Sequence, residues 1–457
     1  MSERSEPLPI SRGWSRRGQW AFMSFEGTPM QRLMRHCSAG EWAEAERLCE
    51  AILAREPSQP ALLLLSGEIA LKRGDLATAR ERLRRAGQIK IADVGWLERL
   101  ANIMLRAGDL EPAAATLRRL LHAAPQHLGA LCALGDIYQA LDRVDEAVAA
   151  YEAAAALSPG HTRPHTARAI LLLRRAWGPP LPSPPDKQQM KSSSGRIAMT
   201  TLGKNGRLGN QMIQYAFLRF YGRVHHLQVE VPDWIGRWLF DLDDPHPGSA
   251  LPTFKEERPD ASGPLLSEGL PPTLANHDLW GYFGCHTSYF RPHQSLFRTL
   301  FRPGARLQPI VARAMARLGM RGRTVVAIHL RRGDYTGGPL FWPAPSSWYL
   351  EWLSSIWRGL ADPVLYVASD DPAVHRDFAQ FSPITAEDLG ERVPGAEMYP
   401  DFHVLSQADV LAISNSSFSV CAALLNARAS SFVRPVPGER RLLPFDPWST
   451  EILLRAT

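Results

Sequence analysis

The sequence lacks the features that mark several classes of protein. It has only five cysteines in 457 residues, at positions 37, 49, 132, 285 and 421, and no two of them form a Cys-x-x-Cys pair. Such an odd, dispersed set argues against a disulfide framework and for a reducing compartment. The N-terminal stretch is polar and basic without the apolar core of a signal peptide, and no apolar run approaches the ~20 residues that span a bilayer. We therefore expect a cytoplasmic protein, with at most peripheral contact at the inner face of the membrane.

Charge of one sign is only mildly in excess. The net charge is +6, and Lys and Arg form no block of the kind that binds nucleic acid, so we expect no nucleic-acid partner. A mild basic excess suits a phosphate-bearing ligand or an anionic membrane as well as nucleic acid, and charge alone does not choose among them. The length predicts two or three domains. We expect the basic tail, residues 1–27, to be disordered.

The first third of the chain repeats itself. The segments GEWAEA, GDLATA, GDLEPA and DRVDEA begin at positions 40, 74, 108 and 142, so each begins 34 residues after the one before. The same step relates four alanines, at 45, 79, 113 and 147, whose small side chains let paired helices approach closely. The pattern resembles the tetratricopeptide repeat, in which stacked helical hairpins bury their apolar faces. We expect an α-solenoid over residues 28–177, ending in a capping helix. The usual ligand of such an array is a peptide or partner protein.

A change of composition separates this array from the rest of the chain. Residues 178–195, GPPLPSPPDKQQMKSSSG, are rich in Pro, Ser and Lys and are predicted to be a linker. From residue 196 to 457, short apolar segments such as TVVAIHL and PVLYVASD alternate with helical patterns. That alternation predicts a mainly parallel sheet covered by helices, with enough chain for two Rossmann-like lobes.

The first candidate site is the glycine-rich loop in RIAMTTLGKNGRLGNQMIQYA. Gly206 and Gly209 allow a tight turn whose backbone N–H groups, with the N-terminus of the following helix, would bind an anion. A tight turn without a ligand fits as well. A dinucleotide site with Glu230 as its acidic residue is a rival, which the GxxGxxG spacing weakens. Asn210 could reach a sugar oxygen or cap the helix.

The second candidate site is TVVAIHLRRGDY, residues 324–335. Strand alternation places His329 and Arg331 on one face, at the carboxyl end where open α/β sheets bind ligands. Arg331 and Arg332 suit a pyrophosphate because the planar guanidinium donates two hydrogen bonds to its oxygens. Asp334 is a candidate general base, or else it holds one of these arginines in place.

Two further candidate sites follow. Asp370 and Asp371 end a predicted strand, where they could cap the next helix or accept hydrogen bonds from a base. The adjacent placement of the two carboxylates makes a metal site a poor third option. The second is the polar turn Ser414 to Ser417, which includes Asn415 and Ser416 and opens a helix at Phe418. It predicts another phosphate-binding helix N-terminus, or an ordinary serine cap.

Taken in order, these blocks resemble the α-1,2-fucosyltransferase family of inverting, GDP-fucose-dependent glycosyltransferases. The resemblance runs from about residue 196 to 435 through GRLGNQMIQYA, WGYFGCHTSYF, HLRRGDY, YVASDDP and SNSSFS. It implies a GT-B-type fold of two Rossmann-like lobes, a GDP-fucose donor, a glycan acceptor and no metal or other cofactor. It also departs from the family, since Val420, Cys421 and Ala422 stand where two Trp and a Gly are usual.

The resemblance also assigns roles to individual residues. Arg331 would bind the diphosphate, with His329 and one of Asp370 and Asp371 near the guanine. The donor phosphates would lie under Ser416, Ser417 and Phe418, and Asn210 would face the transferred sugar. Two other functions stay open on the sequence: a protein glycosyltransferase whose repeats capture a polypeptide, and a non-catalytic scaffold with a degenerate transferase domain.

Overall fold

The computed structural model describes residues 28–182, 195–258, 261–335 and 339–456, so the predicted tail and most of the predicted linker lie outside the described residues. The chain divides into two compact units between Ile137 and Tyr138. Of the helices that the structure describes, none has both the length and the apolar character needed to cross a membrane.

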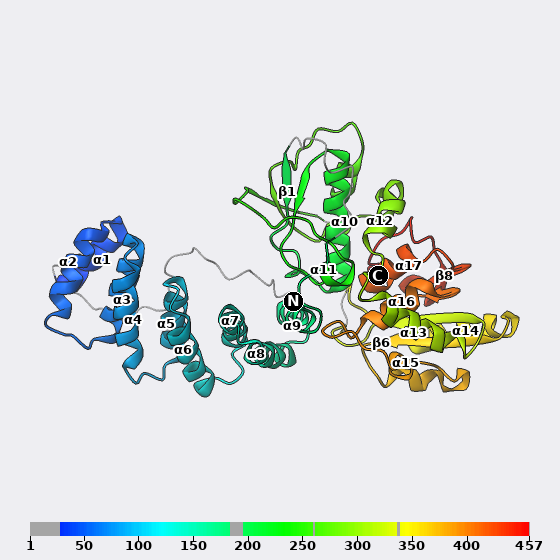
Figure 1. Cartoon of the computed structure of the whole chain (residues 1–457), viewed down its shortest axis with the longest axis horizontal. Helices are drawn as coiled ribbons and strands as arrows, with labels where there is room; N and C mark the ends of the chain where they lie inside the picture. The colour runs from blue at the N-terminus through cyan, green and yellow to red at the C-terminus, as the bar shows by residue number, and fades with distance from the viewer. Residues whose placement is uncertain (1–27, 183–194, 259–260, 336–338, 457) are drawn as a thin grey trace. The chain divides into compact units, whose positions relative to one another are not determined.

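The N-terminal array is built of helical hairpins, as the repeat predicts (Figure 1). Its turns fall on the repeat register: Gly40, Gly74 and Gly108 have φ of 74°, 81° and 67°, the left-handed region that glycine adopts without strain. The alanines of the repeat are fully buried between paired helices. The helices are α1 (Pro29–Ala39), α2 (Trp42–Leu53), α3 (Pro60–Arg73), α4 (Leu76–Gln88), α5 (Val94–Arg106), α6 (Leu110–Ala123), α7 (Leu128–Ala140), α8 (Val144–Leu157) and α9 (Thr162–Trp177).

The first lobe after the linker contains a four-stranded sheet. Its strand order is β2-β1-β4-β3, and all three pairings are parallel. The lobe comprises β1 (Arg196–Ala198), α10 (Leu208–Val224), β2 (Gln228–Glu230), α11 (Gly236–Leu239), β3 (Thr253–Lys255), η2 (Gly263–Leu266), β4 (Asp278–Trp280), η3 (Thr287–Tyr289), η4 (Arg291–His293) and α12 (Gln294–Leu300). Helix α10 is buried around most of its circumference, which makes it the centre of this lobe.

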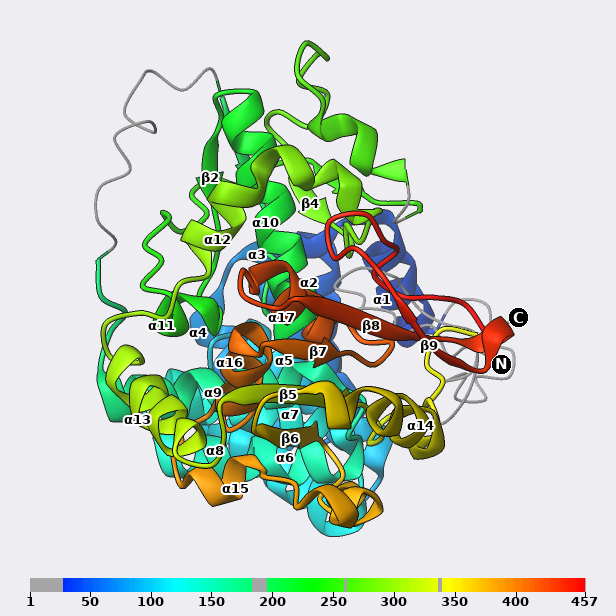
Figure 2. The same ribbon diagram turned by 90° about the vertical axis from the view of Figure 1, so that its right-hand side faces the viewer.

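The second lobe contains a five-stranded sheet of order β6-β5-β7-β8-β9, which Figure 2 shows from the side. Only the last pairing, between β8 and β9, is antiparallel. The lobe comprises α13 (Gln308–Gly319), β5 (Thr324–Leu330), α14 (Ser346–Ile356), η5 (Trp357–Gly359), β6 (Pro363–Ser369), η6 (Val374–Phe381), α15 (Ala386–Leu389), α16 (Tyr399–Gln407), β7 (Val410–Ala412), α17 (Ser417–Leu425), β8 (Ser431–Val436), η7 (Pro437–Glu439) and β9 (Arg441–Pro444).

Both faces of the larger sheet are covered. Along β5, Val325 and Ala327 belong to one apolar core, whereas Val326 and Ile328 belong to another. The first core also contains residues of α13, α16, α17 and, in the first lobe, of α10 and α12, whereas the second contains residues of α14 and η6. A buried parallel sheet with helices on both faces is the architecture that the alternating pattern predicts.

Helix α9 is part of the second compact unit, although its sequence continues the repeats. Ala169, Ile170 and Leu173 lie in the same core as α10 and the larger sheet. The first linker residues are held there as well, because Trp238 Nε1 donates to the Gly178 carbonyl at 2.8 Å and Arg306 Nη1 to that of Pro179 at 2.9 Å. The sequence places the domain boundary in the linker, whereas the contacts place α8 and α9 with the C-terminal domain.

Candidate active site

The candidate site lies where two neighbouring strands of the larger sheet end. Strand β5 pairs with β6 on one side and with β7 on the other. The order of the strands in the sheet therefore changes direction between β5 and β7. In open α/β sheets ligands bind at such a switch point, beyond the carboxyl ends of the strands. His329 and Arg331 come from the end of β5, and the turn 414–417 follows β7.

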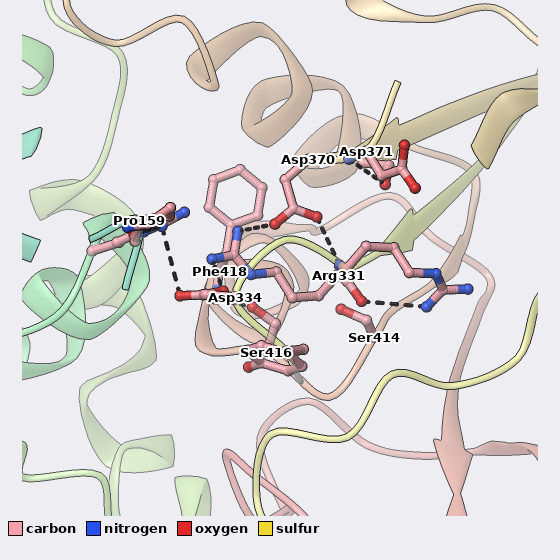
Figure 3. A network of polar contacts seen from close by, with 12 residues as sticks. Pro159, Arg331, Asp334, Asp370, Asp371, Ser414, Ser416 and Phe418 are labelled. Atoms are coloured by element: carbon pink, nitrogen blue, oxygen red, sulfur yellow. Dashed lines mark hydrogen bonds and ion pairs between the residues drawn. The ribbon is translucent and has the colours of Figure 1, made fainter. Parts of the chain in front are cut away.

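Arg331 lies at the centre of a network of charged side chains (Figure 3). Its guanidinium donates to Asp334 Oδ1 at 2.5 Å and pairs with Asp370 Oδ2 at 2.7 Å. The side chain is only 15% exposed, and its charge faces the ring of Tyr335, 5.6 Å away. The planar group is therefore held by two carboxylates, in an orientation that could also present two N–H groups to phosphate oxygens.

Arg332 points away from this network. Its Nη2 approaches Ser346 Oγ at 3.3 Å, and its backbone N–H donates to Asp370 Oδ1 at 2.7 Å. The two adjacent arginines are therefore not equivalent: only the guanidinium of Arg331 joins the cluster of strand ends.

His329 is buried behind Arg331. Its Nδ1 is 2.7 Å from Ser414 Oγ, and its ring lies 5.2 Å from that of Phe418. Burial, with a smaller effect of the charges of Arg331 and Arg332, lowers the pKa of His329 to about 3. The imidazole is therefore neutral at physiological pH, and it can offer a hydrogen bond but no positive charge to a ligand.

The two aspartates after β6 have different environments. Asp370 binds Arg331 and the backbone of Arg332, as described above. Asp371 Oδ1 accepts from the backbone N–H of Ala373 at 2.9 Å, which caps the turn before η6. In the part of the chain that the structure describes, no group of three or more His, Cys, Asp or Glu side chains is placed to hold a metal ion.

Two helix N-termini meet at this site. Gly209, in the first turn of α10, packs against the backbone at the start of α17: a Cβ built there would lie 2.4 Å from Phe418 N. Only glycine allows this approach, which brings the first turns of both helices together. Gly206 turns the preceding loop with φ of 77°. The loop thus has the form that the anion-site prediction requires.

The amides of the candidate residues are not used alike. Asn210 follows Gly209 and is half-buried, and the residue at the cap position of α10 is Arg207 instead. Asn415, 1% exposed, donates to the carbonyls of Leu340 and Leu454 at 2.9 Å and accepts from Leu454 N at 2.7 Å. The Asn415 side chain therefore holds the C-terminal segment, and its amide is engaged within the protein rather than available to a nucleotide-sugar.

The serines of the turn after β7 lie at the start of α17. Ser416 is the N-cap of this helix, and its Oγ accepts from Phe418 N at 3.4 Å. Ser417 is the first residue of the helix. Glu230, the acidic residue of the rival dinucleotide site, has its Oε2 engaged by Arg196 at 3.4 Å and by Gly248 N at 3.2 Å.

The sequence prediction missed Arg207. Its Nη2 donates to the carbonyl of Pro159 at 2.6 Å and lies 3.6 Å from Asp334 Oδ2, so it extends the Arg331 network (Figure 3). Burial, then the charge of Arg331, lowers its pKa. The available signal was the position of Arg207 between Gly206 and Gly209, in the loop predicted to bind an anion. Because Arg207 is not on a strand, no alternation indicated the direction of its side chain.

Two known families match parts of this chain. Residues 280–437 match glycosyl transferase family 11, and residues 28–171 match a tetratricopeptide repeat-like domain. The chain carries a glycosyl transferase family 11 domain. The match confirms the resemblance of its C-terminal blocks, and it spans β4 to η7, including Arg331, Asp370 and the start of α17. The glycine-rich loop at 203–209 precedes the matched range.

Some solved structures are similar to about a third of this chain. They include a crystal structure of MamA, 19% identical, which covers 32% of this chain and 85% of its own, with a TM-score of 0.28. A tetratricopeptide repeat protein from Parabacteroides merdae is 24% identical over 32% of this chain and 59% of its own, with a TM-score of 0.29. A comparison with curated proteins gave no match.

The family 11 domain of this chain has a distinctive packing where its sequence departs from the usual block. Val420, Cys421 and Ala422 are all fully buried, and Cys421 Sγ lies 3.4 Å from the carbonyl oxygen of Gly209. Cys421 therefore lies in the contact between α10 and α17, where a side chain of tryptophan size would hold the two helices apart.

Proposed function

We propose that this glycosyltransferase transfers L-fucose from GDP-fucose to a sugar hydroxyl, with inversion and without a divalent metal, in the synthesis of a glycan or surface polysaccharide. An α-1,2 linkage to a galactoside is the product we propose, and the two sheet-containing lobes would act as the lobes of a GT-B-type enzyme. The observation that carries the proposal is the meeting of Arg331 with the N-termini of α10 and α17.

The chemistry requires positive charge at the leaving group. When the bond from the sugar C1 to the phosphate oxygen breaks, its electron pair stays on the diphosphate. The acceptor hydroxyl oxygen bonds to the opposite face of C1 and gives its proton to a general base, for which Asp334 is the candidate. Arg331 and the free N–H groups of the two helices would stabilise that developing charge. Asn210, beside Gly209, would face the sugar. His329 and Asp371 would be left for the guanine, because Asp370 is engaged with Arg331.

Donor binding is the first test. Titration calorimetry in the presence of EDTA should show that the wild type binds GDP and GDP-fucose. Arg331→Ala should lose at least about 10²-fold in affinity, or in the rate of a transfer assay. Arg313→Ala is the matched control, since Arg313 also pairs with a carboxylate, Glu391 at 2.8 Å, but does so on α13. If the folded wild type binds neither nucleotide, the donor assignment is wrong and a non-catalytic scaffold is favoured.

The role of Asp334 can be separated by one substitution. Its two oxygens face Arg331 and Arg207, which favours a positioning role over that of general base. For a base, Asp334→Asn should reduce kcat by about 10²–10⁴-fold with little change in the Kd of GDP. For a positioning residue, the change should appear mainly in the Kd of GDP, with a loss of kcat under about tenfold.

The acceptor is the second question. The repeat-like domain favours a polypeptide ligand, so that a protein acceptor is the alternative substrate. Transfer of radiolabelled fucose to free galactosides would support the glycan acceptor. Transfer only to polypeptide, lost when the array is altered, would support the protein acceptor.

A further inference from the structure

The corner between α8 and α9 contacts the glycine-rich loop directly. Thr162 Oγ1, at the start of α9, donates to the Lys204 carbonyl at 2.9 Å. Gln211 Nε2 donates to Thr166 Oγ1 at 3.1 Å, and Arg207 Nη2 donates to the Pro159 carbonyl at 2.6 Å. Three hydrogen bonds thus join residues 159–166, which continue the repeats by sequence, to the loop that opens α10.

The middle of these three bonds is buried. Thr166 is 8% exposed and Gln211 is 1% exposed. The same Gln211 Nε2 also donates to the Gly206 carbonyl at 2.9 Å, so that a continuous path runs from Thr166 through Gln211 to the turn of the loop. A buried hydrogen bond is costly to lose because the remaining polar group has no water to replace its partner.

The loop in turn sets the geometry of the charged network. It fixes the first turn of α10, where Gly209 packs against α17, and it carries Arg207, which lies 3.6 Å from Asp334 Oδ2. Asp334 holds Arg331 at 2.5 Å. A shift of the α8–α9 corner would therefore move the N-terminus of α10 and Arg207 relative to Arg331.

We propose that residues 159–166 are a positioning element of the diphosphate site and that Thr166 is the positioning residue. The last segment of the repeat array would thus help to position the residues of the transferase site. The proposal rests on the proposed function for its effect on donor binding, but its effect on the loop can be measured without any nucleotide.

The experiment uses the full-length chain with three substitutions. Thr166→Val removes the hydroxyl and keeps the shape, and Thr166→Ser restores the hydroxyl. Arg174→Ala is the control on the same helix, because Arg174 pairs with Asp233 at 2.6 Å, outside the glycine-rich loop. Hydrogen exchange of the amides in residues 200–211, the Kd of GDP, and kcat and KM for GDP-fucose are measured for each.

Thr166→Val should speed hydrogen exchange in the loop about tenfold and raise the Kd of GDP by about 5–20-fold. For GDP-fucose, the KM should change more than the kcat. Thr166→Ser should behave as the wild type, and Arg174→Ala should change neither quantity by more than about twofold. Loop exchange in Thr166→Val within twofold of the wild type would overturn the proposal. If no protein binds GDP, the proposed function fails, and the exchange data alone still decide whether Thr166 positions the loop.

Discussion

Replacing Gly209 by alanine tests whether the two helix N-termini are in contact. The added Cβ would lie 2.4 Å from Phe418 N and 2.5 Å from the Ser417 carbonyl carbon, whereas ordinary contact begins near 3.4 Å. Backbone atoms cannot rotate away, so α17 and α10 must separate by roughly 1 Å. Overpacking of this kind costs about 1–3 kcal/mol. The better helix propensity of alanine returns up to about 1 kcal/mol. We expect a net loss of about 1–2 kcal/mol in the free energy of unfolding.

The assay is urea unfolding followed by tryptophan fluorescence, to which the buried Trp234 and Trp238 of the first lobe contribute. Gly319→Ala is the control, because Gly319 ends α13 and a Cβ there meets no atom within 4 Å. That variant should be neutral or slightly stabilised. GDP affinity should fall for Gly209→Ala only, since separating the helix ends moves their N–H groups. Equal stability of the two variants would refute the contact.

Three further changes have defined outcomes. Unfolded histidine titrates near pH 6.5 but His329 only near pH 3, so unfolding takes up a proton between these values. For His329 alone, lowering the pH from 7 to 5 should therefore cost about 2 kcal/mol of stability in urea titrations. His329→Gln should lose that part of the slope, while other buried histidines such as His403 keep theirs. Asn415→Ala should lower the free energy of unfolding by about 2–4 kcal/mol, measured by thermal melting, because it leaves the carbonyls of Leu340 and Leu454 unpaired. Gly333→Ala should cost about 1–3 kcal/mol in the same assay, because its Cβ would lie 2.4 Å from Asp370 Oδ2, and Asp370 is held by Arg331 and by the backbone N–H of Arg332.

Much of the fold and part of the site follow from periodicity. A period of 34 residues predicted the hairpins, and the alternation in TVVAIHL predicted two faces of a strand, with Val325 and Ala327 in one apolar core and Val326 and Ile328 in the other. The carboxyl ends of parallel strands share an edge, so the blocks at 329–334, 370–371 and 414–418 could be expected together. These predictions depend only on backbone geometry, which repeats along the chain.

The remaining features depend on tertiary contacts that no local pattern encodes. The apolar face of α9 is typical of the last helix of a solenoid. Periodicity indicates that a helix face is buried, but it does not indicate which element covers that face. In the same way, the polar turn at 414–417 predicts a phosphate site, but the Asn415 amide donates its hydrogen bonds to the carbonyls of Leu340 and Leu454, which are distant in the sequence. The direction of Arg207 depends on Pro159, 48 residues earlier.

The charges of the site indicate why helix geometry matters so much in this protein. Within the network that the structure describes, the guanidiniums of Arg331 and Arg207 face the carboxylates of Asp334 and Asp370, so the side-chain charges nearly balance. A diphosphate would have to compete with those carboxylates for Arg331. The surplus attraction then comes from the N-termini of α10 and α17, each worth about 0.3–1 kcal/mol when exposed and up to about 2 kcal/mol when partly buried. That surplus acts over a short range and is lost if either helix end moves by an ångström or so. The contact at Gly209 and the hydroxyl of Thr166 should therefore influence donor affinity, although neither carries a charge.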